Sequence, residues 1–188
     1  MLKQAITLLH QHARAGNDFS LSVNLSGKTM NDLELAGDLG EMLKDNPIPP
    51  GRLVVEVTET AAIVNIERAR ELSQQLRQMG CLFALDDFGS GFSSFYYLKH
   101  LEFDYLKIDG EFIVNLVTSA TDQLLVQAVV DIARGLGTQT VAEFVGDDQT
   151  VELLRELGVD YGQGFHLGRP AAVHELLPQL PDAGAQPH

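Results

Sequence analysis

The chain has 188 residues, of which 45% are hydrophobic and 21% charged, and 26 acidic against 13 basic side chains give a formal net charge of −13. This length and composition fit one globular domain and argue against a disordered chain. The acidic balance argues against a nucleic-acid polymer as partner, whereas a small phosphorylated ligand held through metal ions is compatible with it. Because no apolar run approaches the ~20 residues that span a bilayer and no signal peptide is recognisable, we expect a cytoplasmic protein without membrane contact.

Short apolar, β-branched runs alternate with helical patterns along the chain. Strands are predicted at residues 21–25, 53–58, 82–85, 105–108, 140–145 and 161–167. Helices are predicted at residues 2–13, 31–44, 66–79, 95–101, 122–136, 150–157 and 172–180. This alternation with short connections indicates parallel strands joined by right-handed crossovers. We expect residues 1–177 to form one domain and residues 178–188 to form a flexible tail.

A charged or amide side chain stands near the C-terminal end of nearly every predicted strand. These residues are Asn24, Glu56, Asp86, Asp87, Lys107, Asp109, Glu143 and Gln163. An open doubly wound sheet concentrates functional groups at one or two strands, whereas a (β/α) barrel draws them from many strand ends. The distribution therefore favours an α/β fold of the TIM-barrel type.

Converging strand ends would place four carboxylates, from Glu56, Asp86, Asp87 and Glu143, beside the amide of Asn24. So many buried anions repel one another unless cations are present, and oxygen ligands of this kind suit Mg²⁺ or Mn²⁺. The adjacent Asp86 and Asp87 could serve two ions, which is a recurrent arrangement for phosphodiester hydrolysis. Lys107 could orient or activate the attacking water, or neutralise charge on the phosphoryl group.

Several of these residues also have a purely structural interpretation. A single acidic residue at a strand end is commonly a helix cap, and we interpret Asp147 and Asp148 in this way. Lys107 could instead form a buried ion pair with Asp109. Glu59 would face away from Glu56 in an extended strand, so we expect it to brace a loop.

Six short motifs together resemble the EAL domain family of cyclic di-GMP phosphodiesterases. They are Ser22-Val-Asn-Leu-Ser26, Glu56-Val-Thr-Glu59, Leu85-Asp-Asp-Phe-Gly-Ser-Gly-Phe-Ser-Ser94, Leu106-Lys-Ile-Asp109, Val141-Ala-Glu143 and Gln163-Gly-Phe. The resemblance covers about residues 1–170 and implies a barrel that cuts cyclic di-GMP to linear pGpG with two Mg²⁺ or Mn²⁺ ions.

The resemblance also implies a role for each matched residue. Metal binding falls to Asn24, Glu56, Asp86, Asp87 and Glu143. Lys107 would lie by the catalytic water with Asp109 and Glu143 in supporting catalytic roles, Gln163 would line the substrate site, and Glu59 would brace the Asp-Asp-Phe-Gly loop. The family uses this loop in dimer formation, so we expect self-association, with a sensor or GGDEF-type domain upstream in the parent protein.

The sequence departs from the family pattern in two places that concern activity. It holds no Glu-Ala-Leu motif, so we expect about six of the eight barrel strands, one metal ligand fewer and impaired turnover. The common Ala-Glu-Gly-Val-Glu motif stands here as Ala142-Glu143-Phe144-Val145-Gly146. The alternatives are an inactive EAL-like module that binds cyclic di-GMP or a protein partner, and an unrelated metal-dependent barrel enzyme.

Overall fold

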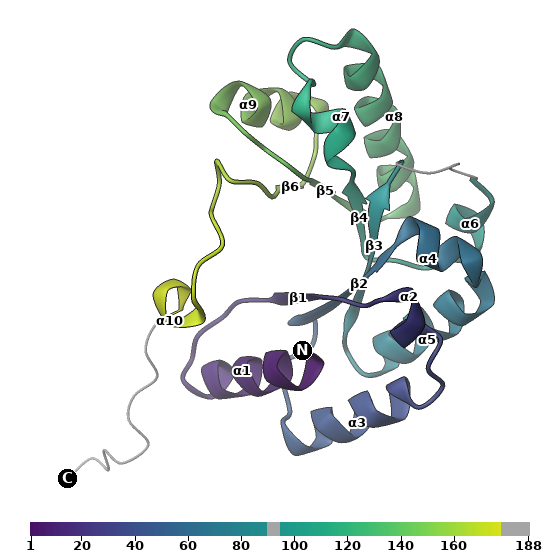
Figure 1. The fold of residues 1–188 in the computed structure, drawn as a ribbon, viewed down its shortest axis with the longest axis vertical. Helices are drawn as coiled ribbons and strands as arrows, with labels where there is room; N and C mark the ends of the chain where they lie inside the picture. The colour runs from purple at the N-terminus through teal and green to yellow at the C-terminus, as the bar shows by residue number, and fades with distance from the viewer. Residues whose placement is uncertain (90–94, 178–188) are drawn as a thin grey trace.

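Six parallel strands form one curved sheet in the computed structural model, which describes residues 1–89 and 95–177. In chain order the strands are β1 (Leu21–Asn24), β2 (Leu53–Thr58), β3 (Leu82–Phe88), β4 (Tyr105–Ile108), β5 (Gln139–Ala142) and β6 (Tyr161–Gly162). Each pairs with its neighbours in sequence, so β1 and β6 are the two edges of the described sheet. Figure 1 shows the strands curving into an open part of a barrel with helices outside, which confirms the predicted barrel type and its six strands.

Helices lie before, between and after the strands, and all except α10 lie on the convex side of the sheet (Figure 1). They are α1 (Leu2–Arg14), α2 (Gly27–Met30), α3 (Leu35–Asp45), α4 (Glu59–Val64), α5 (Ile66–Gln78), α6 (Phe95–His100), α7 (Gly110–Val114), α8 (Ala120–Leu136), α9 (Asp148–Leu157) and α10 (Val173–Leu176). No helix in residues 1–89 and 95–177 combines the length and the apolarity needed to cross a membrane.

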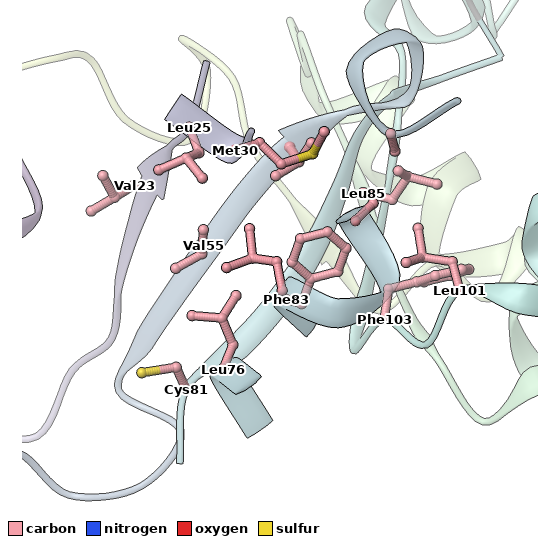
Figure 2. Close-up of a cluster of buried hydrophobic side chains, with 14 of the residues drawn as sticks. Val23, Leu25, Met30, Val55, Leu76, Cys81, Phe83, Leu85, Leu101 and Phe103 are labelled. Carbon is pink, nitrogen blue, oxygen red and sulfur yellow. The ribbon is translucent and has the colours of Figure 1, made fainter. Parts of the chain in front are cut away.

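The hydrophobic core lies between the convex face of the sheet and these helices. Figure 2 shows part of it, where Val23, Val55, Phe83 and Leu85 from β1, β2 and β3 meet Leu76 of α5. Phe83 and Leu85 are fully buried, at 0% exposure. Because side chains alternate across a strand, the residues between them face the concave side, which frees that side for polar groups.

Three short helices, α2, α4 and α7, were not predicted, and several predicted positions need correction. The strands predicted at 140–145 and 161–167 already end at Ala142 and Gly162. Glu59 does not extend β2 but opens α4, because the hydroxyl of Thr58 caps this helix by accepting a hydrogen bond from the Ala61 N–H. The helix predicted from residue 31 begins at Leu35, after a turn in which Asp32 accepts a hydrogen bond from the Glu34 N–H. The predicted tail at 178–188 lies outside the described residues.

The cap of α9 is Asp147 alone, whereas the sequence suggested both Asp147 and Asp148. Asp147 Oδ1 accepts a hydrogen bond from the Thr150 N–H at 2.7 Å. Asp148 is instead the first helical residue, and its exposed carboxylate lies 2.9 Å from His166 Nε2. The hydrogen bond from Thr150 holds the pKa of Asp147 below its ordinary value of 3.8.

We expect Asp147→Ala to lower the thermal midpoint at pH 7 more than Asp148→Ala does, because only the first removes a cap. A lowered carboxyl pKa contributes stability that is present above pH 3.8 and is lost as pH falls through the folded-state value. The gap between wild type and Asp147→Ala should therefore close in strong acid. Calorimetry from pH 7 to pH 2 measures the gap, and a gap that does not depend on pH over this range would contradict the assignment.

Candidate metal and catalytic site

The predicted site residues lie along one rim of the sheet, where the parallel strands end. Asn24 pairs in register with Glu56 across β1 and β2, and Lys107 pairs with Val141 across β4 and β5. Glu143 directly follows β5. Parallel strands bring their carboxyl ends to the same edge, so residues far apart in sequence meet there.

Lys107 lies at the centre of this rim and contacts three carboxylates. Its Nζ is 2.7 Å from Asp86 Oδ1, 2.9 Å from Glu56 Oε2 and 2.9 Å from Glu143 Oε1. The lysine side chain is 5% exposed, so these contacts are shielded from water. The alternative of a Lys107–Asp109 ion pair is not what the structure shows, because Asp109 caps α7 by accepting a hydrogen bond from the Glu111 N–H.

Three carboxylates around one ammonium leave an excess of negative charge. Burial lowers the pKa of Lys107, but its close contacts with Asp86, Glu143 and Glu56 outweigh this effect and raise it overall. Lys107 is therefore a permanent cation at neutral pH. Burial also raises the pKa of Glu143, and the contact with Lys107 offsets this only in part.

A bulge in β3 brings Asp87 to the same place as Asp86. Leu85 pairs with Leu106 and Phe88 with Ile108, so three residue steps in β3 match two in β4. Asp87 takes up the extra step with a left-handed φ of 55°. Consecutive side chains in a regular strand point to opposite faces, and the bulge overrides that rule here.

Asp86, Asp87 and Glu143 form a group that could hold a metal ion. Each offers a carboxylate oxygen, and these oxygens all lie within 4.8 Å of one another. Burial and the charges of Asp86 and Asp109 raise the pKa of Asp87, which indicates uncompensated negative charge. Asp86 Oδ1 is buried and, although close to Lys107, accepts no hydrogen bond of good geometry. The three carboxylates, one of them with an oxygen that lacks a well-aligned hydrogen bond, fit a hard divalent cation.

The remaining predicted residues surround this group without joining its ion pairs. Asn24 is exposed at the end of β1, beside Glu56 in register. Gln163 is exposed just after β6, and its backbone N–H donates to the Ala142 carbonyl at 2.8 Å. Glu59, which is 1% exposed, accepts a hydrogen bond from the Gly89 N–H at 2.8 Å and so connects α4 to the segment that follows β3.

A hollow of about 290 Å³ lies on the concave face of the sheet. Glu56, Lys107 and Gln163 line it together with residues that sequence reasoning did not single out, among them Ser22, Tyr105 and Tyr161. The two tyrosine rings meet edge to face, with centroids 5.9 Å apart. The strand period of two could have identified both tyrosines from the sequence. Tyr105 precedes Lys107 by two positions and Tyr161 precedes Gln163 by two, so each pair shares a face of its strand.

Comparison with known proteins agrees with this geometry, since the EAL domain profile matches residues 1–170. The chain belongs to the EAL domain family. It is 37% identical over 186 residues to the cyclic di-GMP phosphodiesterase PdeB of Shewanella oneidensis, a match that covers 99% of this EAL chain and 22% of PdeB. It is also 37% identical over 160 residues to MucR of Pseudomonas aeruginosa, a bifunctional diguanylate cyclase and cyclic di-GMP phosphodiesterase, covering 85% of the chain and 23% of MucR.

Among solved structures, this EAL chain resembles a complex of the PaMucR phosphodiesterase with c-di-GMP. The TM-score is 0.87 at 35% sequence identity, and the match covers 94% of this chain and 72% of the other. The chain therefore spans about a fifth of the length of the curated relatives it matches, and most of the matched structure.

The Lys107 cluster, formed by Lys107 with Glu56, Asp86 and Glu143, leads to a prediction about the stability of this EAL domain. Without metal, Lys107→Met should lower the free energy of unfolding by about 3 kcal/mol, because it leaves buried carboxylates without their cation. Urea unfolding in EDTA measures this loss. Lys44→Met, which changes an exposed lysine on α3, is the control and should shift stability by less than about 0.5 kcal/mol. Equal stability of the two variants would show that water already screens the cluster.

Proposed function

We propose that this EAL domain contains a metal-dependent phosphodiesterase site that hydrolyses cyclic di-GMP to linear pGpG. The observation that carries the proposal is the contact of Lys107 with Glu56, Asp86 and Glu143 on one rim, where the β3 bulge adds Asp87. An acidic group with a buried cation beside it suits a phosphodiester, because metal ions can bind the carboxylates while the lysine faces the anionic substrate.

The residues divide into two groups by their chemistry. Asn24, Glu56, Asp86, Asp87 and Glu143 would hold two Mg²⁺ or Mn²⁺ ions, since amide and carboxylate oxygens suit these hard cations. When bound, such ions stabilise the attacking and leaving oxygens of a phosphodiester and lower the pKa of water.

Lys107 acts as a charged donor, because its raised pKa keeps it protonated and unsuited to accept a proton. Its ammonium would hold the attacking water or a phosphoryl oxygen, and Glu143 would keep the lysine in place through their 2.9 Å contact. Asp109, which lies two residues after Lys107 and caps α7, would support this arrangement.

The substrate and loop residues complete the proposed site. Gln163 lines the same concave hollow as Lys107 and would donate or accept hydrogen bonds with the nucleotide. Glu59 would brace the Asp-Asp-Phe-Gly segment through its hydrogen bond with Gly89, and so fix the bulge that positions Asp87. In the parent protein, a sensor or GGDEF-type domain would control this site. MucR, by its name, combines a diguanylate cyclase with a cyclic di-GMP phosphodiesterase in one protein.

The activity test follows release of pGpG by chromatography with Mg²⁺ or Mn²⁺ present. The 188 residues hold no Glu-Ala-Leu motif, to which the family resemblance assigns a further ligand, so we expect slow turnover by these residues alone. Joining a Glu-Ala-Leu segment to the N-terminus should raise the rate. In that extended protein, Glu56→Ala, Asp86→Ala, Lys107→Ala and Glu143→Ala should each abolish release, whereas Asp148→Ala should retain it.

Two outcomes would contradict parts of this proposal. Rapid release by the 188 residues alone would mean that another carboxylate completes the metal site. Binding of cyclic di-GMP without release, even in the extended protein, would favour the alternative of an inactive receptor module. Gly146 would then be the first residue to test, because the common family motif has glutamate at this position.

We also propose that the domain self-associates through its sheet edges. Strands β1 and β6 each have one paired neighbour among the described residues, and an unpaired strand edge presents free backbone groups to another chain. Analytical ultracentrifugation should show a dimer or larger species at micromolar concentration. Leu21 and Leu25 donate their N–H groups to β2, so the N–H of the exposed Ser22 faces the free edge, and Ser22→Pro should reduce self-association. A strictly monomeric wild type would refute the proposal.

A further inference from the structure

Phe144 has an unusual backbone conformation beside the candidate site. Its φ is 55°, and Asp87 is the only other residue besides glycine with a positive φ in the described parts of the chain. A bulky side chain at such a φ is strained, and strain of this kind persists where the surrounding structure or function requires it. Glycine would adopt this conformation without cost.

The ring of Phe144 rests against the backbone of Gly110. A methyl group added at Gly110 would lie 2.2 Å from Phe144 Cδ2, so only glycine leaves room for the ring at that position. The contact fixes one side of the ring, while the residue remains 68% exposed. Phe144 therefore exposes an aromatic ring of fixed orientation to solvent and adds little to the core.

The ring lies beside chain segments that carry two proposed catalytic groups. Phe144 directly follows Glu143, whose carboxylate contacts Lys107, and Gly110 directly follows Asp109 at the start of α7. The aromatic surface thus connects the ends of β4 and β5 on the rim that carries the acidic group. Neither the proposed metal ligands nor the core accounts for an exposed phenylalanine at this place.

We propose that Phe144 is a substrate-binding residue whose ring stacks on one purine base of the dinucleotide substrate. This inference rests on the proposed function. Phosphates would lie at the metal ions and Lys107, so the bases must be held by groups outside the acidic cluster. An exposed aromatic ring of fixed orientation suits this task, because stacking on a base requires no charge and no hydrogen-bond partner.

A tryptophan at this position reports stacking directly. The chain contains no tryptophan, so Phe144→Trp would introduce a single indole fluorophore. Cyclic di-GMP added with Mg²⁺ should quench its fluorescence within the first seconds in a stopped-flow instrument, before turnover. Leu136→Trp is the control, because Leu136 is 48% exposed at the end of α8 that precedes β5, away from the rim, and should show no quenching.

Phe144→Gly tests the contribution of the ring to ligand affinity separately from its contribution to stability. Glycine tolerates the left-handed φ, so the thermal midpoint should stay equal or rise, while equilibrium dialysis should show about a tenfold loss of affinity for cyclic di-GMP. Phe144→Leu keeps the apolar volume without an aromatic face and should show a similar loss.

Three results would overturn the proposal, and they differ in what else they affect. If Phe144→Trp binds cyclic di-GMP as tightly as the wild type but its fluorescence is not quenched, stacking is excluded and the proposed function is unaffected. Unchanged affinity in Phe144→Gly, with a changed sedimentation coefficient, would identify the ring as a contact between copies of the chain. Absence of cyclic di-GMP binding by the wild type in dialysis would remove both the stacking and the proposed function.

Discussion

The buried ammonium of Lys107 is the interaction on which the rest of the site depends. It contacts carboxylates from β2, from β3 and from the residue after β5, so one cation on β4 connects four consecutive strands. Buried ions require such pairing, because removing a charge from water costs several kcal/mol. The same contacts leave a net negative charge, so the arrangement that holds the rim together also prepares it for metal ions.

Local backbone features orient the other polar groups toward this cation. The β3 bulge turns Asp87 toward the group that holds Asp86, and the hydrogen bond from Gly89 to Glu59 fixes the chain just beyond it. Phe144 occupies a second left-handed position on the same rim. Each device departs from regular strand geometry at a strand end, where the core no longer dictates side-chain direction.

The sequence predicted the fold type and the strands because apolar periods and polar strand ends repeat along the chain. It also placed Glu56, Asp86, Lys107 and Glu143 on one rim, which the geometry brings into contact. It did not predict which partner Lys107 would take, because strand period alone could not distinguish Asp109 from carboxylates on other strands. The short helix α4 was also missed, because Thr58, the last residue of β2, caps a helix that begins at Glu59.

The strand order has a consequence for how the domain is made. Because β1 to β6 pair strictly in chain order, each strand pairing closes a loop of only one crossover, which favours fast folding. Glu56 and Asp86 lie on the neighbouring strands β2 and β3, so these two strands alone would bury two carboxylates without a cation. Lys107 on the next strand supplies that cation, so the rim is stable only once β4 has joined the sheet.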